Sequence, residues 1–207
     1  MLECDAMMRC LPVGEPQEPV SRRRRRRRQI ILLGLLTLAW LSAGRATQAA
    51  GPDLGPLLDA MGILRPVKEA QAPDFTLPDV AGKARRLTEF RGQVVLINFW
   101  ATWCAPCRAE MPGMERLYRE MKNDRVTILA VNFLEAAEQV EPFVKELGLT
   151  FPILLDEEGQ VSRLYRAFTL PMTFLLDRHG MAVGRALGGR EWDSAEAKRL
   201  IRALGAR

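Results

Sequence analysis

Two cysteines separated by two residues stand between a predicted buried strand and a predicted helix. Cys104 and Cys107 follow the largely apolar run 94–99, which suits a strand covered on both faces. Between the cysteines, Ala105 and Pro106 suit a helix start, since proline is tolerated in a first helical turn. Two cysteines in one such turn are close enough to form a disulfide after a small adjustment. We therefore expect a buried strand that leads into a helix with the pair at its N-terminus.

The position of the pair favours thiol chemistry over a structural bridge. A disulfide that encloses two residues removes little loop entropy from the unfolded chain, so it adds little stability. The N–H groups and dipole at a helix N-terminus favour a thiolate and lower the pKa of a cysteine there. We expect Cys104 to attack a disulfide and Cys107 to resolve the mixed disulfide. Zinc is not expected, because a lone Cys-x-x-Cys lacks a second pair of ligands and His179 is the only histidine.

Basic charge is concentrated in the N-terminal segment. The chain of 207 residues has a net charge of +5 and contains seven consecutive arginines at 22–28. Acidic and basic residues balance from position 50 onward. A neutral body has no general attraction for phosphate backbones, so nucleic acid is not an expected partner.

The arginine tract and the apolar run 30–41 that follows it are typical of an export signal. This run is shorter than the ~20 residues of a spanning helix. Residues 30–44 could still remain uncleaved as an anchor, with the arginines on the cytoplasmic side. A solvated basic tail is the less favoured interpretation. We expect a periplasmic or extracytoplasmic protein, either secreted or tethered to the inner membrane by residues 30–44.

Composition and periodicity divide the chain into three parts. Residues 1–49 are the basic region with the signal or anchor, 50–71 a Gly- and Pro-rich linker with a short helical stretch, and 72–207 the compact domain. The domain alternates strand and helix patterns, which predicts an α/β fold with a central mixed β-sheet flanked by helices. The expected strands are an N-terminal hairpin of 75–77 with 85–87, the runs 94–99 and 126–131, and a hairpin of 172–176 with 181–187; helical spacing marks 114–121, 140–147 and 197–204.

The cysteine pair is part of a longer pattern, VVLINFWATWCAPCRAEMP at 94–112, accompanied by APDFTLPD at 72–79, LTEFRG at 87–92 and LPMTFLLD at 170–177. These segments resemble the TlpA/ResA/CcmG family of extracytoplasmic thioredoxin-like reductases, which are related to the redoxin and AhpC/TSA proteins. The resemblance covers roughly residues 72–207. It implies a thioredoxin fold with an N-terminal β-hairpin extension and a dithiol reductase that needs no cofactor or metal.

The resemblance also implies roles for particular residues. Pro171 is expected as a cis-proline beside the pair, where the neighbouring backbone binds the substrate chain. Glu110 corresponds to an acid near the second cysteine that could relay its proton if burial raises the pKa; a solvated first-turn acid is the alternative. Asn98 stands where cytosolic thioredoxins carry a buried Asp, which leaves proton relay to Glu110. The expected substrate groove consists of Trp103, Ala105, Pro106, Thr169 and Leu170, beside a redox disulfide between Cys104 and Cys107.

Partners follow from the same resemblance, and two other functions stay open. The expected substrates are disulfides of apocytochrome c, of copper-site proteins or of other thioredoxin-fold proteins, and the expected electron donor is a thiol-reducing membrane protein. A thiol peroxidase is the first alternative, although Ala101 and Ile97 stand where peroxidases carry an activating Thr and a Pro. A non-enzymatic binding module or copper chaperone is the second, although the Cys-x-x-x-Cys pattern of such chaperones is absent from the sequence.

Overall fold

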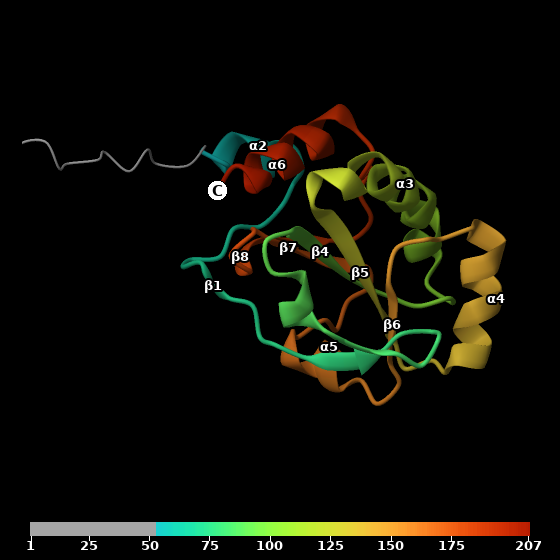
Figure 1. Ribbon diagram of the computed structural model, residues 1–207. Helices are drawn as coiled ribbons and strands as arrows, with labels where there is room; N and C mark the ends of the chain where they lie inside the picture. Colours follow the sequence, from blue (N-terminus) through green and yellow to red (C-terminus); the bar gives the residue numbers. More distant parts are fainter. Residues whose placement is uncertain (1–52) are drawn as a thin grey trace, which may run out of the picture. The chain divides into compact units, whose positions relative to one another are not determined.

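A mixed sheet of six strands forms the centre of residues 53–207, the part of the chain that the computed structural model describes (Figure 1). In the order β1-β8-β7-β4-β5-β6, the strands are Ala70–Gln71, Met181–Leu187, Met172–Leu176, Val94–Trp100, Val126–Phe133 and Ile153–Asp156. β4, β5 and β6 are parallel, whereas β7 is antiparallel to β4, β8 to β7 and β1 to β8. Every residue of β4 is buried, because this strand is central and both faces of the sheet are covered.

Helices and a hairpin cover the two faces of the sheet. On one face lie α2 (Gly55–Ala60), α3 (Ala105–Met121), α4 (Ala137–Leu147) and α6 (Ala195–Gly205), which share a core with Leu96 and Ile128. On the other face, Ile97 and Leu129 pack against the following elements. These are the hairpin β2 (Thr76–Pro78) with β3 (Ala84–Arg86), the 3-10 helix η1 (Leu87–Phe90) and α5 (Gln160–Leu164). A further 3-10 turn, η2 (Lys122–Asp124), precedes β5.

Most predicted elements are confirmed, and the differences concern short ones. The N-terminal hairpin, both central strands, the β7–β8 hairpin and all three helices are present. β6 and α5 were not predicted. They have four and five residues, so neither is long enough to show a clear period. The Ser194 side chain caps α6 by accepting a hydrogen bond from the Ala197 N–H.

Residues 53–71, the described part of the predicted linker, pack against the compact domain. The described residues from 53 onward already belong to the compact unit, whereas the sequence places its start near Ala72. Leu54 and Leu58 are buried in the same core as α6, and β1 extends the sheet beside β8. The apolar residues around α2 span only about two helical turns and lie among glycines and prolines. The composition of this segment therefore resembles that of a linker.

The predicted export signal and anchor at residues 1–49 lie outside the described residues. Among the helices of residues 53–207, none combines the length and apolar character needed to cross a membrane.

Candidate active site

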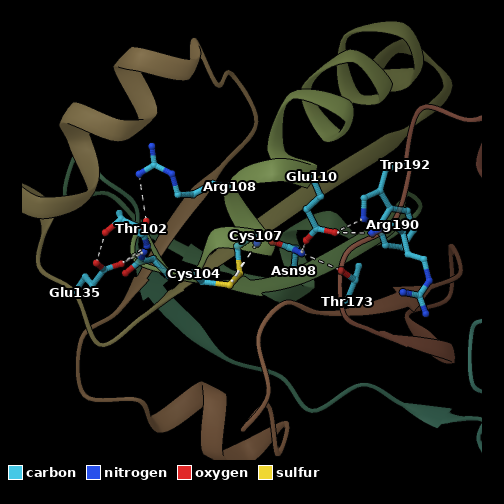
Figure 2. The surroundings of a disulfide bond; sticks show 11 residues. Asn98, Thr102, Cys104, Cys107, Arg108, Glu110, Glu135, Thr173, Arg190 and Trp192 are labelled. Atoms are coloured by element: carbon cyan, nitrogen blue, oxygen red, sulfur yellow. Dashed lines mark hydrogen bonds between the residues drawn. A yellow bond between two sulfur atoms is a disulfide. The ribbon is translucent and has the colours of Figure 1, made fainter.

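Cys104 and Cys107 form a disulfide at the N-terminus of α3 (Figure 2). β4 ends at Trp100, and four residues later Cys104 caps the helix in an extended backbone conformation. Cys104 Sγ accepts a hydrogen bond from the Cys107 backbone N–H at 3.3 Å. The Cα atoms of the pair are 5.3 Å apart, so the first turn of the helix accommodates the bond. The first sulfur thus sits at the positive end of the helix dipole, where a thiolate is stabilised.

The two sulfur-bearing side chains differ in access. Cys107 is fully buried, whereas Cys104 keeps 6% of its surface exposed and lines an open, mainly apolar groove. The aromatic side chains of Trp103 and Phe168 line this groove and are 66% and 73% exposed. The remaining lining residues are Ala105, Pro106, Phe133, Ala167, Thr169 and Leu170. All five predicted groove residues are therefore brought together, and Phe133, Ala167 and Phe168 are additions that sequence reasoning missed.

Pro171 closes the segment that forms one wall of this groove. The Leu170–Pro171 peptide bond is cis, and Pro171 is buried just before β7. Its carbonyl oxygen accepts a hydrogen bond from the Gly188 backbone N–H at 2.9 Å. The preceding Thr169 is exposed and Leu170 is half-buried. The backbone just before the cis bond therefore lies at the groove, where an extended chain could pair with it.

Glu110 is buried behind the pair, one helical turn after Cys107 on α3. Oε1 accepts a hydrogen bond from Asn98 Nδ2 at 2.9 Å, while Oε2 accepts from Trp192 Nε1 at 3.0 Å and from Arg190 N at 3.1 Å. Burial raises the pKa of the Glu110 carboxyl, and these donors together with the nearby Arg190 charge partly oppose that rise. Glu110 is thus a buried acid rather than a solvated one.

Asn98 connects Glu110 to the sheet. It lies on β4, fully buried, and its Nδ2 also donates to Thr173 Oγ1 on β7 at 2.9 Å. An Asn at this strand position supplies a donor to the carboxylate, which a second carboxylate at this position would not do when ionised. The asparagine at position 98, where cytosolic thioredoxins carry an aspartate, therefore donates a hydrogen bond directly to Glu110.

A second buried carboxylate lies on the opposite side of the disulfide (Figure 2). Glu135, just after β5, accepts hydrogen bonds from the Thr102 N–H at 2.8 Å, from the Thr102 hydroxyl, and from Asn132 Nδ2 at 2.8 Å. It thereby fixes the loop that leads into Cys104. Sequence reasoning missed Glu135, although the carboxyl ends of parallel β4 and β5 meet at this edge and polar residues after both strands were a usable signal.

No metal centre is assembled in the described part of the chain, where no three His, Cys, Asp or Glu side chains are grouped as ligands. The site offers thiol and acid–base chemistry: the accessible sulfur of Cys104, the buried sulfur of Cys107 and the buried carboxyl group of Glu110 one turn after it.

Known proteins share this arrangement of sequence and fold. The chain is 50% identical over 109 residues to the thiol-disulfide oxidoreductase ResA of Geobacillus thermodenitrificans (strain NG80-2), which covers 53% of this chain and 63% of that protein. It is 45% identical over 114 residues to the thioredoxin-like protein YneN of Bacillus subtilis (strain 168), covering 54% of this chain and 66% of YneN. The chain thus matches somewhat less than two thirds of the length of these relatives.

Solved structures confirm the predicted thioredoxin fold. A thiol:disulfide interchange protein of the thioredoxin family from Chlorobium tepidum TLS superposes with a TM-score of 0.56 at 26% identity, covering 67% of this chain and 99% of that one. StoA from Bacillus subtilis superposes with a TM-score of 0.53 at 29% identity, covering 63% and 96%.

Most of the described fold, with the cysteine pair, falls within one recognised sequence family. The model of the AhpC/TSA family matches residues 69–183, more than half of the 207 residues. This range includes the hairpin extension, the cysteine pair, Glu110 and Pro171. On the strength of that match, the chain belongs to the AhpC/TSA family.

Proposed function

We propose that this protein is a thiol-disulfide oxidoreductase that reduces protein disulfides outside the cytoplasm. The observation that carries the proposal is the disulfide at the α3 N-terminus, with Cys104 at an apolar groove and Cys107 buried one turn before Glu110. The relative ResA, which is named a thiol-disulfide oxidoreductase, supports the same chemistry. The export pattern of residues 1–49 supports the location, in which disulfides persist.

The reaction begins from the reduced dithiol. The Cys104 thiolate attacks one sulfur of the substrate disulfide, which forms a mixed disulfide and releases the other substrate sulfur as a thiolate. The Cys107 thiol then passes its proton to the Glu110 carboxylate and attacks Cys104 Sγ. This step releases the second substrate sulfur and leaves the Cys104–Cys107 disulfide. Two electrons have moved from the protein dithiol to the substrate.

The groove indicates how a substrate chain binds. Trp103 and Phe168 provide exposed apolar contacts, while the backbone at Thr169 and Leu170 is available for main-chain pairing. An extended segment around a disulfide fits this surface better than a small charged molecule, because the lining carries no acidic or basic side chain. We propose apocytochrome c, copper-site proteins or other thioredoxin-fold proteins as substrates, and a thiol-reducing membrane protein as the electron donor.

The proposal predicts that a Cys107→Ala variant traps substrates. Without the resolving thiol, the mixed disulfide on Cys104 has no intramolecular route to release. Mass spectrometry of adducts isolated from the native compartment should therefore find protein partners attached to Cys104. A Cys104→Ala/Cys107→Ala control should capture nothing. An empty trap would contradict a protein-disulfide substrate.

Membership of the AhpC/TSA family makes a thiol peroxidase the second candidate. Two buried positions argue against it, since Ala101 and Ile97 supply neither an activating hydroxyl nor the expected proline. We expect Cys104 of the reduced protein to react with hydrogen peroxide at a rate close to that of an ordinary thiol of similar pKa. Stopped-flow measurement with detection of sulfenic acid tests this, and rapid sulfenic acid formation would favour the peroxidase instead.

A further inference from the structure

The loop between β8 and α6 contacts two parts of the candidate site. At its start, the Gly188 N–H donates to the carbonyl oxygen of Pro171. Farther along, the Arg190 N–H and the Trp192 Nε1–H both donate to Glu110 Oε2, at 3.1 and 3.0 Å. One short segment, the 188–192 loop, thus fixes both the cis-proline wall and the buried carboxyl group.

The side chain of Arg190 fastens this loop to a distant part of the chain. A guanidinium has five N–H donors in a fixed plane, which suits simultaneous binding to several carbonyl groups. Nη1 donates to carbonyl oxygens on the loop side, and Nε and Nη2 donate to carbonyl oxygens at the C-terminal end of α2. The Nη1 acceptors are the carbonyl oxygens of Leu187 at 3.0 Å, Gly188 at 3.3 Å and Gly189 at 2.9 Å. Nε donates to the carbonyl oxygen of Met61 at 2.9 Å, and Nη2 donates to that of Gly62 at 3.0 Å.

The end of α2 is well suited to receive an arginine. Carbonyl groups in the last turn of a helix lack partners within the helix and carry the negative end of its dipole. The chain turns there at Gly62, whose positive φ of 60° directs it away from the helix axis. The apolar side of α2 is anchored independently, since Leu54 and Leu58 are buried against the core. The loop is therefore held against a fixed support.

Few charged groups face Glu110, so the donors on the loop dominate its surroundings. From α3 itself, the titratable neighbour is Cys107, one turn earlier. β4 contributes the uncharged amide of Asn98, which leads on to the Thr173 hydroxyl of β7. The loop contributes the Trp192 indole and the only cation acting on this carboxyl, Arg190, among the described residues.

We propose that Arg190 is a positioning residue for thiol-disulfide exchange, whose guanidinium holds the 188–192 loop against α2 and thereby keeps two N–H donors on Glu110. This inference rests on the proposed function, because it acts through proton transfer between Glu110 and Cys107. It also gives residues 61–62, which lie in the segment that resembles a linker, a part in supporting the site.

Removal of the guanidinium frees the loop from α2 and lengthens the hydrogen bonds to Glu110. The ionised carboxylate then loses stabilisation, so its pKa rises further and it accepts the proton of Cys107 only at higher pH. Loss of a hydrogen bond to a charged group and of a nearby cation shifts such a group by about one pH unit. Resolution of a mixed disulfide should accordingly become about tenfold slower on the acidic side of its pH profile, with an unchanged plateau.

The test uses the protein in the form that a bacterial host exports, reduced and mixed with oxidised glutathione as the probe. Acid quenching and mass spectrometry follow the lifetime of the Cys104–glutathione mixed disulfide over a range of about pH 5 to pH 9. We expect Arg190→Ala to shift the acidic limb of the pH profile of resolution to higher pH by about one unit. Arg190→Lys should restore the profile only in part, because an ammonium keeps the charge but does not span five carbonyl groups. Arg190→Ala should have no further effect in a Glu110→Gln background.

Arg199→Ala is the matched control, since Arg199 is exposed on α6 and pairs with Glu196 of the same helix. It should leave the profile unchanged. Uniform slowing at every pH, an effect that adds to Glu110→Gln, or full restoration by lysine would each overturn the positioning role. If Glu110→Gln resolves the mixed disulfide at the normal rate, proton transfer to Glu110 and with it the positioning role of Arg190 are refuted. If the wild-type protein forms no mixed disulfide, the proposed function itself fails, which is a separate result.

Discussion

We expect the Cys104→Ser protein to lose all measurable disulfide reduction. Serine at this helix N-terminus is not ionised near neutral pH, so the site has no nucleophile to open a substrate disulfide. Cys107 does not substitute for it, because that side chain is fully buried and does not line the groove. The measurement is reduction of insulin by the pre-reduced protein, with free thiols of insulin counted after the reaction.

Cys107→Ser provides the informative comparison. It keeps the accessible sulfur and should form one equivalent of mixed disulfide, whereas Cys104→Ser should form none. Circular dichroism should show both variants folded, since a disulfide that encloses two residues adds little stability. Disulfide reduction by Cys104→Ser at the wild-type rate would refute the assignment of the nucleophile.

Glu110→Gln should slow the resolving step by about 10²-fold while leaving the first attack by Cys104 nearly unchanged. The amide keeps the shape of the side chain and an acceptor oxygen but does not take up the proton of Cys107. The acidic limb due to Glu110 should disappear from the pH profile of resolution. Rapid-quench measurement of mixed disulfide formation and decay separates the two steps.

Glu115→Gln is the matched control for this experiment. Glu115 is also a buried carboxylate of α3, but it binds Thr150 and Arg119 and makes none of the contacts at the disulfide. It should exchange disulfides at the wild-type rate. If the two variants slow resolution equally, the effect lies in helix stability and not in proton transfer.

Glu110 also makes folding stability depend on pH. Its pKa in the folded protein lies above the ordinary value of 4.5, because burial disfavours the carboxylate. The folded state therefore binds more protons than the unfolded state between these two pKa values. The contribution of the protonated carboxyl to stability is complete below 4.5 and is lost as pH rises through the folded-state pKa. Urea unfolding should show this decline in the wild-type protein and not in Glu110→Gln.

The parts of the fold that the sequence predicts are those with local periods. The run at β4 and the helical spacing of α3 are visible in single windows, so the Cys104–Cys107 pair is placed correctly at a strand-to-helix junction. Elements as short as β6 and α5 carry no such period. For the same reason, the few apolar residues around α2 resemble part of a linker in the sequence.

The surroundings of the pair depend on contacts between residues far apart in sequence. Glu110 was identified from a resemblance, but its donors Arg190 and Trp192 lie 80 and 82 residues later. The bond from Arg190 to Met61 joins residues separated by 129 positions. No local sequence pattern predicts these contacts, because they result from the packing of α2 and the β8–α6 loop on one face of the sheet. Glu135 differs, since its place after β5 was open to prediction from strand order.

The unequal access of the two sulfurs has a kinetic consequence. Only Cys104 is open to a partner, so a protein that oxidises the pair and a protein that reduces it again must both bond to the same atom. They must also occupy the same groove, and each has to depart before the other arrives. Turnover should therefore follow a ping-pong pattern, with parallel double-reciprocal lines when the concentrations of both partners are varied. An excess of either partner then inhibits the other half of the cycle by competition.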